Sequence, residues 1–170
     1  NVFSPACDGI LDASKFNKDS LVPFMVKENF DLVEEFIIQH SRLNKLSPSA
    51  VNTVRIFTQL NNLNEVILLG SRLRISVNSP VDNMAAGNLA APIDEATGKI
   101  IGAAVYSDIT KKEETKHPVT GVEIVGFQIP FWKEILVMVK EAALLYPANR
   151  SIGWDIVVTK DKSNLFTNNP

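Results

Sequence analysis

Two β-rich runs joined by an asparagine-rich turn constrain the fold of this chain more than any other feature. Residues 51–59 are rich in β-branched side chains, and residues 65–76 carry a second largely apolar run. The segment 61–64 between them contains Asn61, Asn62 and Asn64, and asparagine is typical of turns. The two runs therefore predict an antiparallel hairpin.

Most other regular elements that the sequence predicts are also strands. We expect a helix with Phe16, Leu21, Phe24 and Met25 on one face in residues 15–27, and a stronger helix in residues 131–146, which Pro147 ends. The polar segments 39–50 and 78–91 are predicted loops. The predicted strands are 30–38, a hairpin of 89–94 and 100–106, then 122–129, 151–160 and 164–168. This order favours an α+β fold with an antiparallel sheet and few helices over a doubly wound parallel sheet.

Composition excludes several classes of protein. The chain has 170 residues, of which 45% are hydrophobic and 21% charged, so it fits one domain or two small lobes. Its formal net charge of −2 gives no basic footprint for nucleic acid. No apolar run approaches the ~20 residues of a transmembrane helix. Cys7 is the single cysteine, so we expect no internal disulfide and a cytoplasmic location.

The sequence lacks the glycine-rich phosphate loops and the nucleophile elbow that mark common enzyme classes. The informative features are instead polar residues within apolar strands. Glu34 and Glu35 stand inside the predicted strand 30–38, which fits either an edge strand or a strand that leads into a nucleotide pocket. Arg55 is flanked by apolar residues, with Arg74 on the returning strand. They are either surface residues or a clamp for phosphate or carboxylate.

Two further features are open to a structural or a functional interpretation. Asp155 follows Trp154 at the start of a buried strand, so it is either a capping residue or a magnesium ligand, with Asn169 as a second oxygen donor. The pairs Asp82-Asn83, Gly87-Asn88 and His117-Pro118 are typical of plain turns.

Several short strings carry a further signal when they are taken in order. They lie at 33–40, 43–44, 48–49 and 51–56, then at 81–83, 86–87, 117–121, 126–132 and 152–156. Each string is unspecific alone, but together they cover about residues 33–169 and resemble the sugar-transfer-associated ATP-grasp family. The resemblance implies two α+β lobes that hold ATP between them. It also implies ATP-dependent ligation through an acyl phosphate, linked to sugar transfer or polysaccharide biosynthesis, with a small-molecule or sugar-linked carboxylate as substrate.

The resemblance also assigns roles to individual residues, with ATP and Mg2+ as the implied cofactors. Residues implied to contact the adenine and ribose are Glu34, Glu35, Phe36, Ile37, Gln39, His40 and Leu165. Residues implied to face the phosphates or the acyl phosphate are Arg55, Arg74, Asn83 and Gly87. The implied magnesium ligands are Asp155 and Asn169. Such a set fits phosphoryl transfer, which depends on positioning and charge neutralisation rather than on a covalent nucleophile.

Three departures from the family pattern leave the activity open. Thr167 stands where the family carries a metal-binding glutamate, and Asn88 replaces a glycine. No Lys-Pro pair precedes the predicted hinge strand, so we expect residues 1–30 to be a remnant of the preceding lobe and 31–170 to form the C-terminal catalytic-type lobe. We therefore carry three hypotheses: an ATP-grasp ligase, a degenerate module that binds nucleotide or a sugar-linked ligand without catalysis, and a structural domain that shares only the fold.

Overall fold

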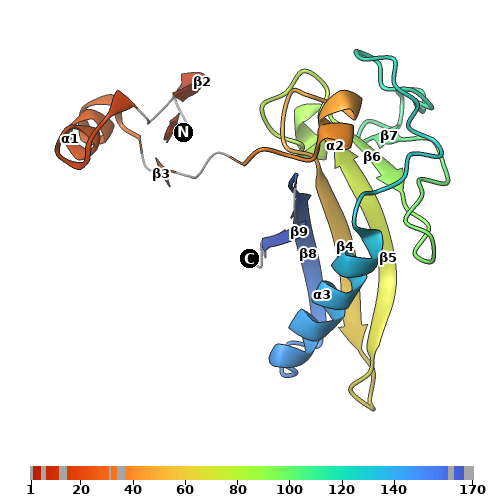
Figure 1. Cartoon of the computed structure of the whole chain (residues 1–170). Coiled ribbons are helices and arrows are strands. Elements are labelled where there is room, and N and C mark those ends of the chain that lie inside the picture. Colours follow the sequence, from red (N-terminus) through yellow and green to blue (C-terminus); the bar gives the residue numbers. More distant parts are fainter. Residues whose placement is uncertain are drawn as a thin grey trace. The chain divides into compact units, whose positions relative to one another are not determined.

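The computed structural model describes residues 2–4, 7–11, 15–30, 32–33, 37–160 and 163–166. The chain divides into two compact units, with the boundary between Ile37 and Ile38 (Figure 1). No helix in these described ranges is both long and apolar enough to cross a membrane.

The first unit contains a small antiparallel sheet and one helix. The sheet has the order β2-β1-β3, formed by Cys7–Leu11, Val2–Ser4 and Leu32–Val33. Helix α1 spans Lys18–Glu28, which confirms the predicted helix. Asn17 and Ser20 form a capping box at its start, since each side chain bonds the backbone N–H of the other. The predicted apolar face is half-buried, and the Phe16 and Phe24 rings lie 4.4 Å apart.

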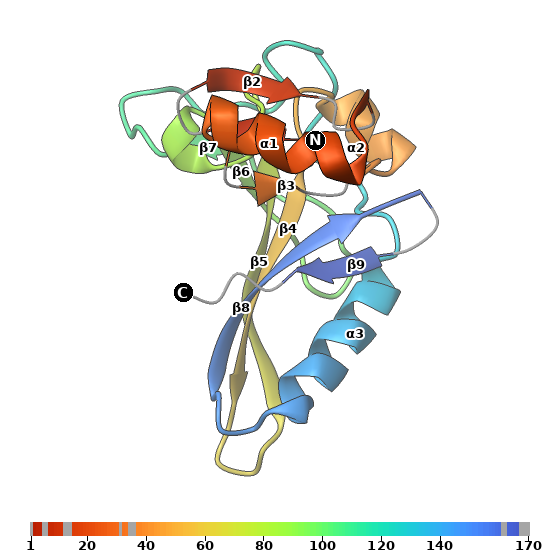
Figure 2. The same cartoon turned by 90° about the vertical axis from the view of Figure 1, so that its left-hand side faces the viewer.

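The second unit is built on a six-stranded antiparallel sheet with the order β7-β6-β5-β4-β8-β9. The strands are β4 (Thr53–Leu60), β5 (Val66–Ile75), β6 (Leu89–Pro92), β7 (Val105–Tyr106), β8 (Ser151–Val158) and β9 (Ser163–Phe166). Strands β4 and β5 form the predicted hairpin, and β6 pairs with β7 as the second one. Figure 2 shows β4, β5 and β8 as the long strands of this sheet.

Helix α3 (Trp132–Leu145) covers one face of this sheet (Figure 1). Alternate residues of β4 are fully buried, among them Val54 and Ile56, and they share one core with Ile135 and Val139 of the helix. This period-2 burial places the intervening residues of each strand on the opposite face. The core thus fixes which face of the sheet carries the polar side chains.

Three sequence predictions need correction. The segment 39–50 was expected to be a loop but contains helix α2 (Ser41–Leu46), which His40 caps by accepting the Arg42 backbone N–H at Nδ1. Residues 122–129 form isolated bridges at Glu123 and Gln128 instead of a strand. The loop 78–91 contains a short 3-10 helix, η2 (Met84–Ala86), and the first residues of β6.

The predicted strand 30–38 is described only at Leu32–Val33, with Ile37 and Ile38 in no regular element. Its residues 34–36 lie outside the described residues. The final strand β9 begins at Ser163 and is described as far as Phe166.

The turn before the second hairpin's return packs tightly against α3. Gly98 has φ +74°, and a Cβ there would lie only 2.2 Å from Cγ of Trp132. The indole N–H of Trp132 donates to the carbonyl of Glu95 at 2.9 Å. The Thr97 hydroxyl and backbone N–H bond the Asp94 carboxylate and hold its pKa below the usual value. A side chain at residue 98 is therefore excluded by both backbone conformation and contact.

We predict that Gly98→Ala lowers the free energy of unfolding by about 3 kcal/mol or more, because it adds a steric clash to left-handed backbone strain. Gly121→Ala is the matched control, since Gly121 has φ +70° with no atom within 4 Å of its Cβ position. It should lose only the backbone cost of about 1–2 kcal/mol. Urea unfolding of both variants measures the difference, and equal losses would contradict the Trp132 contact.

Candidate functional site

The face of the sheet opposite α3 gathers charged residues from three neighbouring strands. Thr53 and Arg55 lie on β4, Arg74 on β5 and Asp155 on β8. In the β4–β8 ladder, Arg55 is directly opposite Asp155. Residues opposite each other in an antiparallel pair have Cβ atoms about 5 Å apart, so the register itself brings this acid and this base together.

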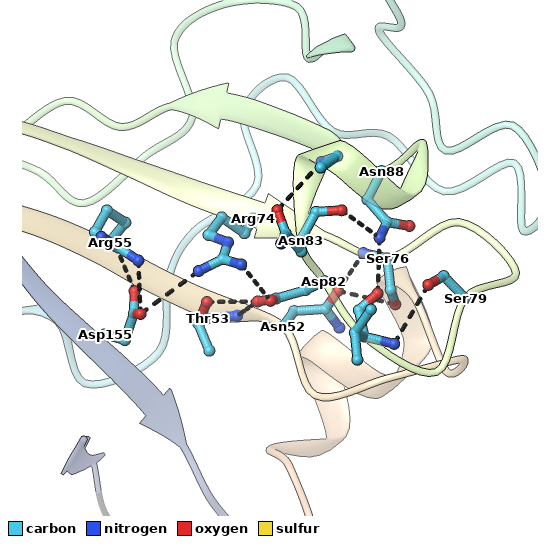
Figure 3. Close-up of polar contacts among 12 residues, drawn as sticks. Asn52, Thr53, Arg55, Arg74, Ser76, Ser79, Asp82, Asn83, Asn88 and Asp155 are labelled. Atoms are coloured by element: carbon cyan, nitrogen blue, oxygen red, sulfur yellow. Dashed lines mark hydrogen bonds and ion pairs between the residues drawn. The ribbon is translucent and has the colours of Figure 1, made fainter. Parts of the chain in front are cut away.

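The four charged groups form a continuous ladder with Asp82 at its end (Figure 3). Arg55 donates Nε–H to Asp155 Oδ1 and Nη2–H to Oδ2, the latter at 2.7 Å. Arg74 approaches the same Oδ2 at 3.5 Å and reaches Asp82 Oδ1 at 3.0 Å. The other oxygen of Asp82 accepts the Thr53 backbone N–H at 2.8 Å and the Thr53 hydroxyl. We call this set the ion ladder.

The ion ladder is sheltered but still reachable from solvent. The side chain of Asp155 is 6% exposed, whereas Arg55 retains 26% of its surface. The two arginines balance the two acids in charge, which permits their burial. The bidentate geometry of Arg55 on Asp155 is the strongest form of such a pair.

A buried polar network holds the loop that supplies Asp82. The Asn52 amide donates to the side-chain oxygen of Gln39 and to the carbonyls of Ser47 and Ala50, and its oxygen accepts the Ser76 backbone N–H at 2.9 Å. The Asn88 amide donates to the carbonyls of Val81 and Asn83, and its oxygen accepts the Val77 backbone N–H at 2.7 Å. Both asparagines are fully buried. The loop after β5 is therefore tied to the sheet at several points.

His117 secures the same loop from the other side. Its Nδ1 accepts the backbone N–H groups of Val119 and Thr120, which assigns the proton to Nε2. Nε2 then donates to the carbonyl of Ser76 at 2.8 Å. The Thr120 hydroxyl donates to the Leu46 carbonyl at 2.8 Å. His117 and Thr120 thus have structural partners, in agreement with the turn interpretation.

The residues expected near the phosphates lie on adjacent strands and on the loop that follows β5. Arg55, Arg74 and Asp155 come together in the ion ladder, on adjacent strands. Asn83 and Gly87 are exposed and flank η2, where the Asn83 side chain accepts the Ala85 backbone N–H at 3.2 Å and Gly87 has φ +83°. They belong to the loop that begins with Asp82.

The residues expected near the base and ribose are placed only in part. Glu34, Glu35 and Phe36 lie outside the described residues. Gln39 is buried, and its amide nitrogen is committed to Ser47 and Ala50 carbonyls. The His40 ring packs edge-on against Phe131, with 5.7 Å between ring centroids.

Ile37 and Leu165 are also expected near the base, and Ile37 is half-buried. Leu165 lies on β9 opposite Ile156 of β8. Asn169, expected to bind magnesium, and Thr167 lie outside the described residues. The site residues that the sequence could not assign are Asp82 as the partner of Arg74 and the Gln39–Asn52 pair. The signal for Asp82 was its position in a polar loop directly after the arginine-bearing strand.

Within the part of the chain that the structure describes, no group of three His, Cys, Asp or Glu side chains is arranged to hold a metal. Both oxygens of Asp155 contact guanidinium groups. Magnesium is usually held by one or two carboxylates together with waters and substrate phosphates. The Asp155 carboxylate does not fit the ion as it stands, because both of its oxygens are engaged by arginines.

A comparison with protein families matches residues 19–168 to the sugar-transfer associated ATP-grasp model. The chain belongs to this family. The match spans most of the sequence and confirms the resemblance that the short strings suggested. The mixed antiparallel fold agrees with the expected fold class. Searches among curated proteins and among solved structures each found no significant match.

We predict that Asp155→Ala lowers the free energy of unfolding by about 2–4 kcal/mol, because it leaves two sheltered guanidinium groups without their shared carboxylate. Chemical denaturation measures this loss. The single variant Arg55→Ala and the double variant Arg55→Ala/Asp155→Ala complete a double-mutant cycle. The double-variant loss minus the two single-variant losses should give a coupling energy of about 1–3 kcal/mol in magnitude. A coupling near zero would show that the pair contributes nothing to stability.

We predict that Asn52→Ala lowers the free energy of unfolding by about 2–4 kcal/mol, because it leaves buried partners on Gln39 and Ser76 unsatisfied. Amide hydrogen exchange should show the largest loss of protection in residues 76–88. Asn62→Ala in the exposed β4–β5 turn is the control and should change stability by less than about 0.5 kcal/mol. Uniform loss of protection over the whole sheet would refute the loop-anchoring role.

Proposed function

We propose that this chain forms part of an ATP-dependent carboxylate–amine, or similar, ligase linked to sugar transfer or polysaccharide biosynthesis. The observation that carries this proposal is the ion ladder, which holds Arg55 and Arg74 side by side on one face of the sheet. A guanidinium group binds phosphate oxygens through two parallel hydrogen bonds. Family membership supports ATP as the source of those phosphates.

The proposed reaction has two steps. A carboxylate oxygen of the substrate attacks the γ-phosphorus of ATP, the bond to the β,γ-bridging oxygen breaks, and ADP leaves with an acyl phosphate remaining. An amine or similar nucleophile then attacks the acyl carbon, loses a proton and releases inorganic phosphate. Charge moves onto oxygen in both steps, so fixed positive groups stabilise the transition states.

We assign the roles within this reaction by position. Arg55 and Arg74 are proposed to bind the phosphates, and the exposed Asn83 and Gly87 to border the transferred group from the loop after β5. The roles of residues 34–37 and Leu165 toward the base, and of Gln39 or His40 toward the ribose, are proposed from the family resemblance alone. At Gln39 the backbone is a stronger candidate than the side chain for a contact with the ribose, because the side chain is already bonded within the protein.

Magnesium remains an implied cofactor, with Asp155 and Asn169 as the proposed ligands. When bound, it would neutralise charge on the phosphates. The described residues do not fit the ion as they stand, because Arg55 and Arg74 occupy the Asp155 carboxylate. This observation favours a second candidate function, in which the protein binds a nucleotide or a sugar-linked ligand without catalysis. Thr167 in place of a glutamate points the same way.

We predict that ATP raises the thermal stability of the protein, with about 2.7 kcal/mol of added stability at 100 times its Kd. Differential scanning fluorimetry with ATP and magnesium measures the shift. Arg74→Ala should abolish it, because a phosphate contact is lost. Lys140→Ala is the matched control, since Lys140 is exposed on α3, which covers the opposite face of the sheet.

The same measurement with excess EDTA separates the two candidate functions. A shift that requires magnesium supports the ligase, whereas an equal shift without the ion supports the binding module. Thr167→Glu should restore a magnesium requirement in the second case, because it returns a carboxylate to the proposed site. No shift at millimolar ATP would rule out both nucleotide-binding proposals.

A further inference from the structure

A third arginine on the same sheet face has no carboxylate partner within the described part of the chain. Arg72 lies on β5 directly opposite Arg55, two residues before Arg74, so its side chain emerges on the face that carries the ion ladder. Arg55 and Arg74 are balanced by Asp155 and Asp82. Arg72 is exposed and supplies a net positive charge beside a neutral cluster.

An aromatic ring lies next to this charge. The guanidinium carbons of Arg72 and Arg55 are 5.6 Å and 5.8 Å from the centroid of the half-buried Phe57 ring. In the sheet register, Phe57 stands between Gly70 on β5 and Gly153 on β8. The ring therefore has no side chain directly opposite it on either neighbouring strand.

Gly153 and Gly70 differ in the space around their Cβ positions. A Cβ at Gly153 would lie 3.3 Å from Cε1 of Phe57, so the ring already lies across that glycine. A Cβ at Gly70 would have no atom within 4 Å. Space beside the ring is thus open on the β5 side, where Arg72 also stands. Glycine in a strand interior weakens the strand and often marks a site of close approach by another group.

We propose that Arg72, Phe57 and Gly70 form a subsite for a carboxylate carried on a sugar ring. The guanidinium fork of Arg72 matches a carboxylate, and no acid in the described part of the chain neutralises its charge. The apolar C–H face of a pyranose packs against the edge and face of Phe57 over the open position at Gly70. This inference rests on the proposed function. Arg72 lies opposite Arg55, which is proposed to bind the phosphates, so a substrate carboxylate at Arg72 would lie beside the proposed phosphate site.

The subsite makes a prediction about small-molecule binding, with D-glucuronate as the probe. Isothermal titration of the full chain at low salt should detect D-glucuronate and give at least tenfold weaker binding for the uncharged D-glucose. Arg72→Ala should weaken glucuronate binding at least tenfold. Arg42→Ala is the matched control and should leave the affinity unchanged. The guanidinium carbon of Arg42 lies 5.5 Å from the centroid of the Phe127 ring, and Arg42 is not part of the ion ladder.

A second variant keeps the charge and removes the space. Gly70 lies in a strand and has no positive φ, so Gly70→Val suits the backbone and should not unfold the protein. Its side chain fills the open position, and we expect at least tenfold weaker glucuronate binding with an unchanged ATP-dependent thermal shift. If ATP binds and glucuronate does not, the subsite is wrong while the proposed function stands.

Several outcomes would overturn the inference. Equal affinity for glucose and glucuronate, or an unchanged affinity in Arg72→Ala, would show that the guanidinium recognises no carboxylate. Tighter binding of glucose 6-phosphate than of glucuronate, lost in Arg72→Ala, would identify a phosphate subsite. Glucuronate binding without any ATP-dependent shift would retain the subsite and remove the ligase.

Discussion

The carboxylate of Asp155 sets the conditions that the rest of the site must meet. It stands on β8 between buried strand residues and keeps only 6% of its side-chain surface. An isolated charge at such a position is costly unless it is paired and hydrogen-bonded. The β4–β8 register supplies Arg55 opposite it, and Arg74 reaches it from the next strand. The antiparallel ladder therefore determines the charge arrangement as directly as it determines the core.

Loop anchoring follows from the same requirement. Arg74 contacts Asp155 at 3.5 Å and is held at 3.0 Å by Asp82, which comes from a loop rather than a strand. A loop can supply a fixed partner only if its backbone is fixed, and Asn52, Asn88 and His117 perform that task. Every buried side-chain nitrogen and oxygen in the described part of the chain has a partner. Complete satisfaction of this kind gives one arrangement of the loop and not several.

The sequence predicted the elements whose side chains repeat with a clear period. Helix α3 and the β4–β5 hairpin were found because their buried residues recur every three to four or every two positions. Helix α2 was missed because it is only six residues long, and two leucines, Leu43 and Leu46, are too few to show a period. Residues 122–129 are apolar enough for a strand, but their backbone is used in turns and single bridges.

The contacts within the site depend on strand register, so the sequence predicts its residues better than it predicts their pairing. Arg55, Arg74 and Asp155 were candidates because a charge within an apolar strand is unusual, yet only three-dimensional pairing shows that they contact one another. Gln39 illustrates the opposite case. The family resemblance implies a ligand contact for it, whereas its amide joins Asn52 with two backbone carbonyls in the fold. A polar residue near a site is thus assigned only when its existing bonds are known.

The distribution of charge over this face bears on the proposed anion binding, because two of its arginines are paired with acids and the third is not paired with a described acid. Each anion that binds Arg55 or Arg74 must compete with a carboxylate that already holds the guanidinium in place. That competition reduces affinity but keeps both side chains in one orientation, which lowers the entropy lost on binding. Arg72 differs, because it lies near Phe57 in a ring contact and has no competing acid among the described residues. Under the proposed function, an anion at Arg72 would therefore displace no described carboxylate, whereas an anion at Arg55 or Arg74 would compete with Asp155 or Asp82.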